Sequence, residues 1–155
     1  RLRKWLNIDK DVFYDTSKIA IMPMGLCYPG KGRSGDLPPR KECAPRWHAS
    51  VLDNLPNIEM TLLIGQYAQQ YYLQDRPKTL TDTVKDWQTW APEYLPLPHP
   101  SPRNTLWLKR NPWFEAEVVP FIQQTVLQAL YPSDLKMQDS EPHILFQFKE
   151  KNAAE

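Results

Sequence analysis

Three short apolar runs, separated by segments of helical character, most constrain what this chain can fold into. The runs are "KIAIMPM" (18–24), "EMTLLIG" (59–65) and "YLPLP" (94–98). Runs of this length and composition are typical of buried strands. Strands that alternate with helices predict an α/β domain, with a short, mainly parallel central sheet and helices on both faces in three α/β/α layers.

The segments between these runs predict the remaining elements. We expect helices within 1–14, 41–55, 66–74, 79–90 and 111–131, and a long loop at 25–40, which holds four of the five glycines. The last helix is supported by an apolar stripe of Phe114, Val118, Phe121, Ile122 and Val126. The segment 143–148 predicts a strand at the edge of the sheet. Because residues 132–155 are otherwise polar, we expect a domain of residues 1–131 and a C-terminal tail.

Composition limits the classes of function. The chain has 155 residues, which favours one domain, and its 19 basic and 18 acidic residues give a net charge of +1. Contact with nucleic acid must therefore come from local patches of charge. Two cysteines are too few for a disulfide framework, and neither a membrane span nor a signal peptide is visible. We expect a cytoplasmic monomer with no membrane partner. The helix-like start "RLRKWL" predicts an N-terminally truncated chain.

The segment "HPSPRN" (99–104) follows the third apolar run. Ligands of parallel sheets bind at the carboxyl ends of the strands, so this loop is a candidate site. A neutral His99 between prolines can donate a hydrogen bond to an oxygen that gains negative charge, or it can simply shape a turn. Ser101, Arg103 and Asn104 can hold a phosphate, but they are also common turn residues. From the residues alone, the turn is the simpler interpretation.

The region 25–46 is locally basic and also holds both cysteines. Its charged residues are Lys31, Arg33, Arg40, Lys41 and Arg46, with Tyr28 and Trp47 among or beside them. This pattern fits contact with a nucleic-acid backbone, or a solvated loop. The glycines form no phosphate-binding pattern, and no histidine has metal-ligand spacing. Cys27 and Cys43 cannot complete a four-thiolate site by themselves, and inert cysteines are the simpler interpretation.

Taken in order, these segments resemble the uracil-DNA glycosylase superfamily. "HPSPRN" is similar to that family's second signature motif, a His-Pro-Ser followed by a DNA-inserting loop. "MGLCYPGKGRSGDLPPRKEC" (24–43) and "TLLIGQYAQQYYL" (61–73) are similar to segments of its iron–sulfur-containing bacterial and archaeal branch. With "LWLKRNPWFEAEV" (106–118), the matches cover most of residues 1–130.

The resemblance implies a DNA-repair enzyme. Such proteins flip a damaged base, for example uracil, out of DNA and hydrolyse its N-glycosidic bond without a metal at the reaction centre. By the match, His99 donates to O2 of the leaving uracil. Ser101 binds a phosphate, while Pro102, Arg103 and Asn104 form a wedge that enters the gap in the DNA. Lys31 and Arg33 are further candidate contacts to the DNA backbone.

Three departures from the family pattern qualify this implication. The first motif, a Gly-rich loop that positions the attacking water, is missing and is expected upstream of Arg1. Within the expected base pocket, Met22, Pro23 and Met24, proline replaces the asparagine that reads the uracil edge. Cys27 and Cys43 match only the later pair of cluster ligands, half of a [4Fe–4S] site that the intact parent would complete.

These departures keep two alternatives open. One is a catalytically inactive DNA-binding module of the same fold. The other is an α/β domain that binds a small ligand at the same edge of the sheet.

Overall fold

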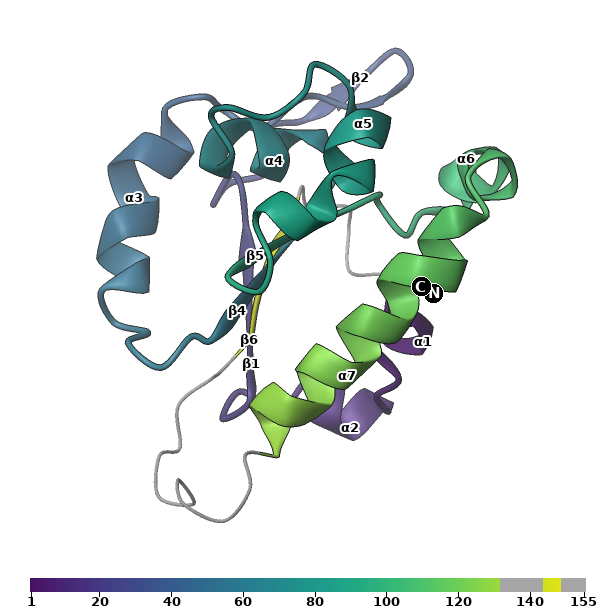
Figure 1. Cartoon of the computed structure of the whole chain (residues 1–155). Coiled ribbons are helices and arrows are strands. Elements are labelled where there is room, and N and C mark those ends of the chain that lie inside the picture. The colour runs from purple at the N-terminus through teal and green to yellow at the C-terminus, as the bar shows by residue number, and fades with distance from the viewer. Residues whose placement is uncertain (132–143, 149–155) are drawn as a thin grey trace.

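The computed structural model describes residues 1–131 and 144–148, and it shows a parallel sheet between two layers of helices (Figure 1). The four strands of this sheet are β1 (Ile19–Pro23), β4 (Met60–Ile64), β5 (Tyr94–Leu97) and β6 (Ile144–Phe148). Their order is β1-β6-β4-β5, and every neighbouring pair is parallel. The predicted three-layer α/β architecture is therefore confirmed.

Helices cover both faces of the sheet (Figure 1). The first layer contains α3 (Cys43–Leu52) and α4 (Gln66–Tyr72), and the second contains α1 (Leu2–Leu6), α2 (Lys10–Phe13) and α7 (Val119–Leu130). Helix α5 (Leu80–Lys85) contacts the edge strand β5. Helix α6 (Thr105–Arg110) comes before α7 in the chain. Side-chain caps begin two of these helices, because Asp9 accepts from the N–H of Val12 and Thr79 from that of Asp82.

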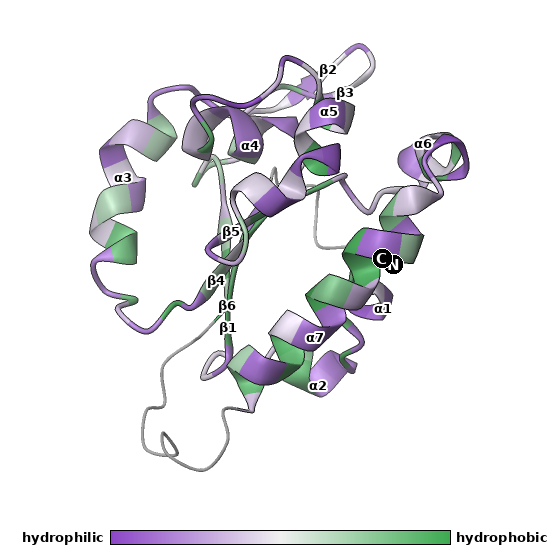
Figure 2. Cartoon of the chain, in the orientation of Figure 1, coloured by the Kyte–Doolittle hydropathy of each residue, from purple (hydrophilic) through white to green (hydrophobic). Residues whose placement is uncertain are grey.

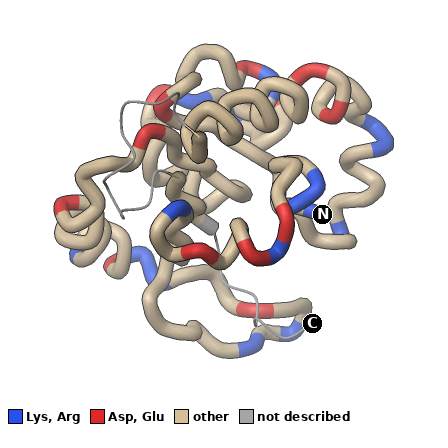
Figure 3. Tube along the Cα trace, turned by 90° about the horizontal axis from the view of Figure 1, so that it is seen from below, with Lys and Arg blue, Asp and Glu red and all other residues tan. Residues whose placement is uncertain are grey.

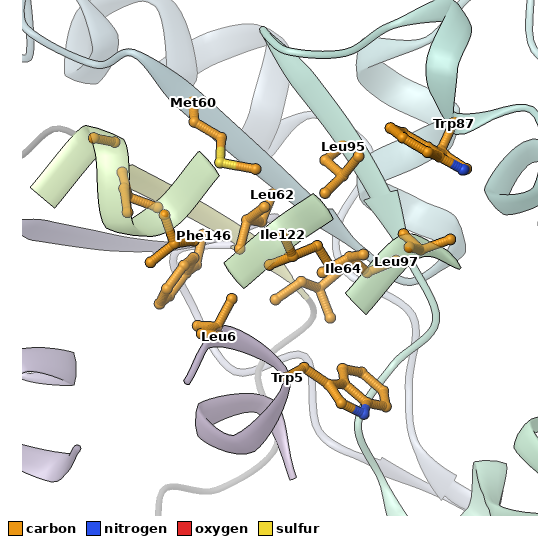
Figure 4. Close-up of a cluster of buried hydrophobic side chains, with 14 of the residues drawn as sticks. Trp5, Leu6, Met60, Leu62, Ile64, Trp87, Leu95, Leu97, Ile122 and Phe146 are labelled. Carbon is orange, nitrogen blue, oxygen red and sulfur yellow. The ribbon is translucent and has the colours of Figure 1, made fainter. Parts of the chain in front are cut away.

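The larger hydrophobic core lies between the sheet and the layer of α1 and α7. Among its members are Trp5, Leu6, Met60, Leu62, Ile64, Trp87, Leu95, Leu97, Ile122 and Phe146 (Figure 4). A second, smaller cluster on the α3–α4 side contains Met24, Ala44, Leu63, Ala68 and Leu73. The strands are hydrophobic along most of their length (Figure 2), as expected for a sheet covered on both faces.

The sequence predicted that the strand at 143–148 lies at the edge of the sheet, and this prediction is wrong. Strand β6 lies in the interior of the sheet. Ile144 pairs with Ile19 of β1 on one side and with Met60 of β4 on the other. Ile144, Leu145 and Phe146 are all fully buried, and a run that is buried on both faces is typical of a central strand. Residues 144–148 thus belong to the sheet rather than to a tail, and the rest of 132–155 lies outside the described residues.

The predicted loop at 25–40 contains a small hairpin. Strands β2 (Lys31–Gly32) and β3 (Gly35–Asp36) are antiparallel, and residues 33–34 connect them. Gly35 has φ +131°, a conformation that other residues rarely adopt. The glycines that predicted an irregular loop here instead permit a tight turn.

Two predicted helices are interrupted. The helix expected at 79–90 ends at Lys85, and a short 3-10 turn, η1 (Trp87–Thr89), follows and buries Trp87. The helix expected at 111–131 is divided into a π-helix, η3 (Phe114–Val118), and the α-helix α7 that directly follows it. Pro120 lacks an N–H and cannot follow the ordinary helical pattern, which explains the change at this point. Helix α6 was not predicted.

Candidate functional site at the carboxyl edge of the sheet

The parallel strands bring three chain segments to one edge. Met24 follows β1, Gly65 follows β4, and His99 lies two residues after the end of β5. Gly65 has φ +85°, and a Cβ built on it would lie 3.8 Å from the Cβ of His99. The loops after β4 and β5 therefore lie in direct contact, which places His99 where ligands of such sheets bind.

The tautomer of a neutral His99 ring is set by its own loop. The backbone N–H of Ser101 donates to Nδ1 of His99 over 3.1 Å. Nδ1 is therefore an acceptor, and in the neutral ring the proton resides on Nε2. His99 is half-buried and so is partly desolvated, and the hydrogen bond from Ser101 orients its ring.

Hydrogen bonds within 99–104 hold this loop as a compact turn. The side chain of Asn104 donates to the carbonyl of His99 over 2.8 Å, and its N–H donates to the carbonyl of Ser101 over 3.0 Å. The Ser101 hydroxyl accepts from the N–H of Arg103 and begins a 3-10 turn, η2 (Pro102–Asn104). Pro102 and Arg103 are exposed, whereas the Asn104 side chain is engaged within the loop. Asn104 thus supports the turn that presents Pro102 and Arg103 to solvent.

Arg1 also holds this loop, which the sequence did not predict. Its Nη1 donates to the carbonyl of Ser101 over 2.9 Å, and its Nη2 donates to the hydroxyl of Thr105 over 3.0 Å. A guanidinium can bridge two acceptors in this way because its donors form a rigid fork. No local pattern indicates such a contact across a hundred residues.

Gln69 of α4 is a second residue that sequence reasoning missed. Its buried Nε2 donates to the carbonyl of Leu63 over 3.1 Å and to that of Leu97 over 2.9 Å. Leu97 also accepts from the N–H of Gly65 over 2.9 Å. One side chain therefore links the ends of β4 and β5. A glutamine on the otherwise apolar face of a predicted helix was the available signal.

The predicted pocket residues lie at the end of β1. Met22 and Met24 are buried, and Pro23 is half-buried. The carbonyl of Pro23 accepts from Nε2 of His48, a fully buried residue of α3, over 3.2 Å. Pro23 therefore takes part in a hydrogen bond through its backbone, although its ring can neither donate nor accept one.

This bond is the end of a buried polar chain that crosses the α3–α4 face. Since Nε2 of His48 donates, its Nδ1 accepts from the Tyr72 hydroxyl over 2.7 Å, and that hydroxyl accepts from Gln147 Nε2 over 3.0 Å. Burial lowers the pKa of His48, opposed only in part by the Pro23 hydrogen bond, and burial raises the pKa of Tyr72. Both groups are therefore neutral in this chain, which connects β1, α3, α4 and β6.

The hairpin adds the predicted basic residues to the same edge. Lys31 and Arg33 are exposed on β2 and on its turn. A Cβ built on Gly35 would lie 3.2 Å from Nη1 of Arg103, so the hairpin packs against the 99–104 loop. Basic and acidic residues are interspersed over the part of the chain that the structure describes (Figure 3), and the sequence has a net charge of only +1. Positive charge at this edge is therefore a local feature.

A sequence model described as the uracil DNA glycosylase superfamily matches residues 1–123 of this chain. The chain belongs to this superfamily. The match includes β1, β4, β5 and the 99–104 loop, whereas β6 lies beyond it. Membership agrees with the predicted fold, and it makes the protein a uracil-DNA-glycosylase-like member of a family that acts on DNA.

The cysteines do not complete the cluster site of the iron–sulfur-containing branch of uracil DNA glycosylases. Cys27 is exposed and Cys43 is half-buried, and both are free thiols. A [4Fe–4S] cluster needs four ligands. Within residues 1–131 and 144–148, no group of three or more His, Cys, Asp or Glu residues could hold a metal ion. The two thiols are therefore at most half of such a site.

The described helices of this uracil DNA glycosylase superfamily member include none that is long and apolar enough to span a membrane.

Proposed function

We propose that this protein flips uracil or another damaged base out of DNA and hydrolyses its N-glycosidic bond. In this reaction the bond between C1′ of the deoxyribose and the base nitrogen breaks, and its electron pair leaves with the base. The water oxygen bonds to C1′, and a proton from the water balances the charge of the released base. Negative charge therefore develops on the leaving base, and a hydrogen-bond donor placed there lowers the barrier.

The observation that carries the proposal is the hydrogen bond from the Ser101 N–H to Nδ1 of His99. This bond places the proton of a neutral ring on Nε2, which can donate to a carbonyl oxygen of the departing base. The donor is preorganised by the hydrogen bonds of Asn104 and by the contact with Gly65. A donor that needs no reorganisation stabilises the transition state more than one that must be oriented first.

The same loop supplies the proposed contacts to DNA. The Ser101 N–H is engaged by His99, so its hydroxyl proton is the group we assign to a phosphate oxygen. Exposed Pro102 and Arg103 form the wedge that enters the gap left by the flipped base, with Asn104 supporting their turn. Flipping costs a few kcal/mol of unstacking, and phosphate contacts from Lys31 and Arg33 help to offset that cost.

Pro23 supports a second candidate, a DNA-binding module of the same fold without glycosylase activity. In the resemblance, this position carries the asparagine that reads the uracil edge, and proline has no side-chain donor or acceptor. The carbonyl of Pro23 is also engaged by His48. Recognition of the base at this position must therefore depend on shape, and the substrate is not restricted to uracil by a side-chain amide.

The test is a glycosylase assay with the full chain on oligonucleotides that each carry one damaged base, uracil included. Base release is scored by strand cleavage at the abasic site in alkali. We expect His99→Ala to slow release by about 10²–10³-fold, the usual effect of removing such a donor. Binding to the same DNA and the unfolding temperature should change little, because His99 is not part of the core.

His99→Asn is the companion variant, since it keeps a shorter N–H donor and should retain more activity than His99→Ala. If the wild type binds DNA but releases no base from any substrate in the panel, the hydrolase proposal is wrong and the inactive module is favoured. If His99→Ala releases bases as fast as the wild type, the assignment to His99 is wrong.

A further inference from the structure

A cleft of about 340 Å³ opens beside the carboxyl edge, between α4 and the segment before α3. Met24 and Ala44, both buried, form its floor. Pro38 and Pro39 come from the segment before α3, and Tyr67 and Tyr71 come from α4. The exposed Arg40, Lys41 and Gln70 complete the lining. The cleft thus combines flat apolar surfaces with two positive charges.

The ring of Tyr71 is held in place, although it is 37% exposed. It packs edge-on against His48, with ring centroids 5.7 Å apart, and against Tyr72 at 4.9 Å. Both of these neighbours belong to the buried polar chain that ends on Pro23. A fixed, partly exposed aromatic ring in an apolar cleft is a surface on which a nucleic-acid base can stack.

The positive charges beside the cleft suit the phosphate group of a nucleotide. Lys41 forms no ion pair among the described residues, whereas Arg40 lies 3.3 Å from the carboxylate of Glu42 on the surface. An apolar slot with cations beside it suits a flat base joined to an anionic phosphate. An apolar peptide would leave Lys41 without a partner of opposite charge among the described residues.

Two lining residues of the cleft lie just after the carboxyl ends of β1 and β4, the edge of the sheet that holds His99. Met24, in its floor, directly follows the last residue of β1. Tyr67, in its wall, is two residues after Gly65, which contacts His99. A single DNA strand that enters the His99 site can therefore continue along the same edge of the sheet.

We propose that this cleft binds a second, unpaired base of the DNA strand that carries the damaged nucleotide. The base stacks on Tyr71, and Lys41 contacts its phosphate. A base in this cleft cannot remain paired in a duplex, so the preferred substrate is single-stranded or locally unpaired DNA. That the bound base belongs to the DNA strand with the damaged nucleotide rests on the proposed function. The stacking of a base on Tyr71 does not.

The experiment measures the affinity of the full chain for a fluorescent single strand with one deoxyuridine, and for the same strand in a duplex. Tyr71→Ala is expected to weaken single-strand binding about tenfold and duplex binding by less than about twofold. Tyr71→Phe keeps the ring and should bind like the wild type. Lys41→Ala should reduce the salt dependence of single-strand binding by about 0.7 in the log–log slope.

Tyr14→Ala is the matched control, because Tyr14 is a 63% exposed tyrosine that caps the C-terminus of α2. Helix α2 lies on the face of the sheet opposite α3 and α4 (Figure 1). Tyr14→Ala should leave both affinities unchanged. Equal losses on the single strand and the duplex, or no loss with Tyr71→Ala, would overturn the cleft proposal. A Tyr71-dependent site that binds free deoxyuridine monophosphate as tightly as the oligonucleotide would also overturn it, in favour of a small-ligand site.

Failure of this inference can be distinguished from failure of the proposed function. If the wild type releases no base but Tyr71→Ala loses single-strand binding, the stacking site stands and the hydrolase proposal falls. If His99→Ala slows base release but Tyr71→Ala binds like the wild type, the hydrolase proposal stands and the stacking site falls.

Discussion

The two faces of the sheet are packed with different chemistry. On the side of α1 and α7, the buried side chains are almost all hydrocarbon, from Trp5 to Ile122 and Phe146. On the side of α3 and α4, the apolar cluster is small, and the fully buried His48 and Gln69 lie beside it with Gln147 of β6. Buried polar groups cost free energy unless they are hydrogen-bonded, so their presence on one face needs a reason.

The partners of these polar side chains supply the reason. His48 donates to the carbonyl of Pro23, and Gln69 donates to those of Leu63 and Leu97. All three carbonyls lie at or near the carboxyl ends of strands, at the edge where His99 is placed. The hydrocarbon face thus provides most of the stability, while the polar face fixes the geometry of the site.

The largest effect should come from the hydrocarbon face. Ile122→Ala removes a fully buried side chain of α7 and should lower the free energy of unfolding by about 2–5 kcal/mol, measured by urea denaturation. DNA binding at temperatures where the variant remains folded should be retained. Leu127→Ala, in the same helix but 60% exposed, should change stability by less than about 0.5 kcal/mol. A loss of DNA binding in the folded Ile122 variant would contradict the division between the faces.

A moderate effect on stability but a marked effect on the site is expected from Gln69→Leu. The change removes two hydrogen bonds but also a buried Oε1 that has no partner among the described residues, so the net destabilisation should be about 1 kcal/mol. Because the ends of β4 and β5 lose the side-chain link that Gln69 adds to their backbone pairing, base release should slow about tenfold, by analogy with other misplaced catalytic groups.

The division between the two faces is tested by comparing, in each variant, the loss of unfolding free energy with the loss in the rate of base release. Ile122→Ala should lose stability and keep the rate of base release at a temperature where it is folded, whereas Gln69→Leu should lose much less stability but release the base more slowly. If Gln69→Leu instead loses stability while its rate remains that of the wild type, the polar face has no special role in positioning His99.

The smallest expected effect is a dependence of stability on pH. Burial lowers the pKa of His48 below its ordinary value of 6.5, so below that pH the unfolded chain binds a proton that the folded chain excludes. Stability should therefore fall as the pH drops below about 6.5 and should not depend on His48 above it. Unfolding temperatures from pH 8 to pH 5 measure this effect.

His48→Gln provides the reference for that measurement, since glutamine can donate to Pro23 but does not titrate. Its stability should fall less steeply with decreasing pH than that of the wild type. Identical slopes for the two proteins would mean that His48 is protonated without cost and is not confined to the neutral form by its surroundings.

Much of the fold could be predicted from local pattern. The apolar runs that became β4 and β5 have few polar residues, and burial on both faces was readable from the sequence there. The run that became β1 is equally apolar, but β1 lies at the edge of the sheet and leaves Ile21 39% exposed. The interior position of β6 could not be predicted, because "ILF" has the same local character in an edge strand and in an interior strand. Only the pairing of Ile144 with both Ile19 and Met60 places β6 in the interior. The hairpin at Lys31 was missed because a pair of two-residue strands leaves almost no pattern.

The site was predictable in outline and not in detail. The strand-end position of His99 follows from counting residues after an apolar run. The location of its proton depends on the N–H of Ser101, and the support from Arg1 and Gln69 depends on contacts between distant segments. Those contacts are consequences of the sheet order, which no local pattern specifies.

The interior position of β6 also has a consequence for the synthesis of this protein. Strands β1 and β4 leave the ribosome long before residues 144–148, which must pair with both of them. Until then, each strand presents an unpaired parallel edge, the kind of surface that recruits other chains. Until residues 144–148 pair, no strand joins β1 to β4 and β5, and the sheet becomes continuous only when this strand is inserted between them.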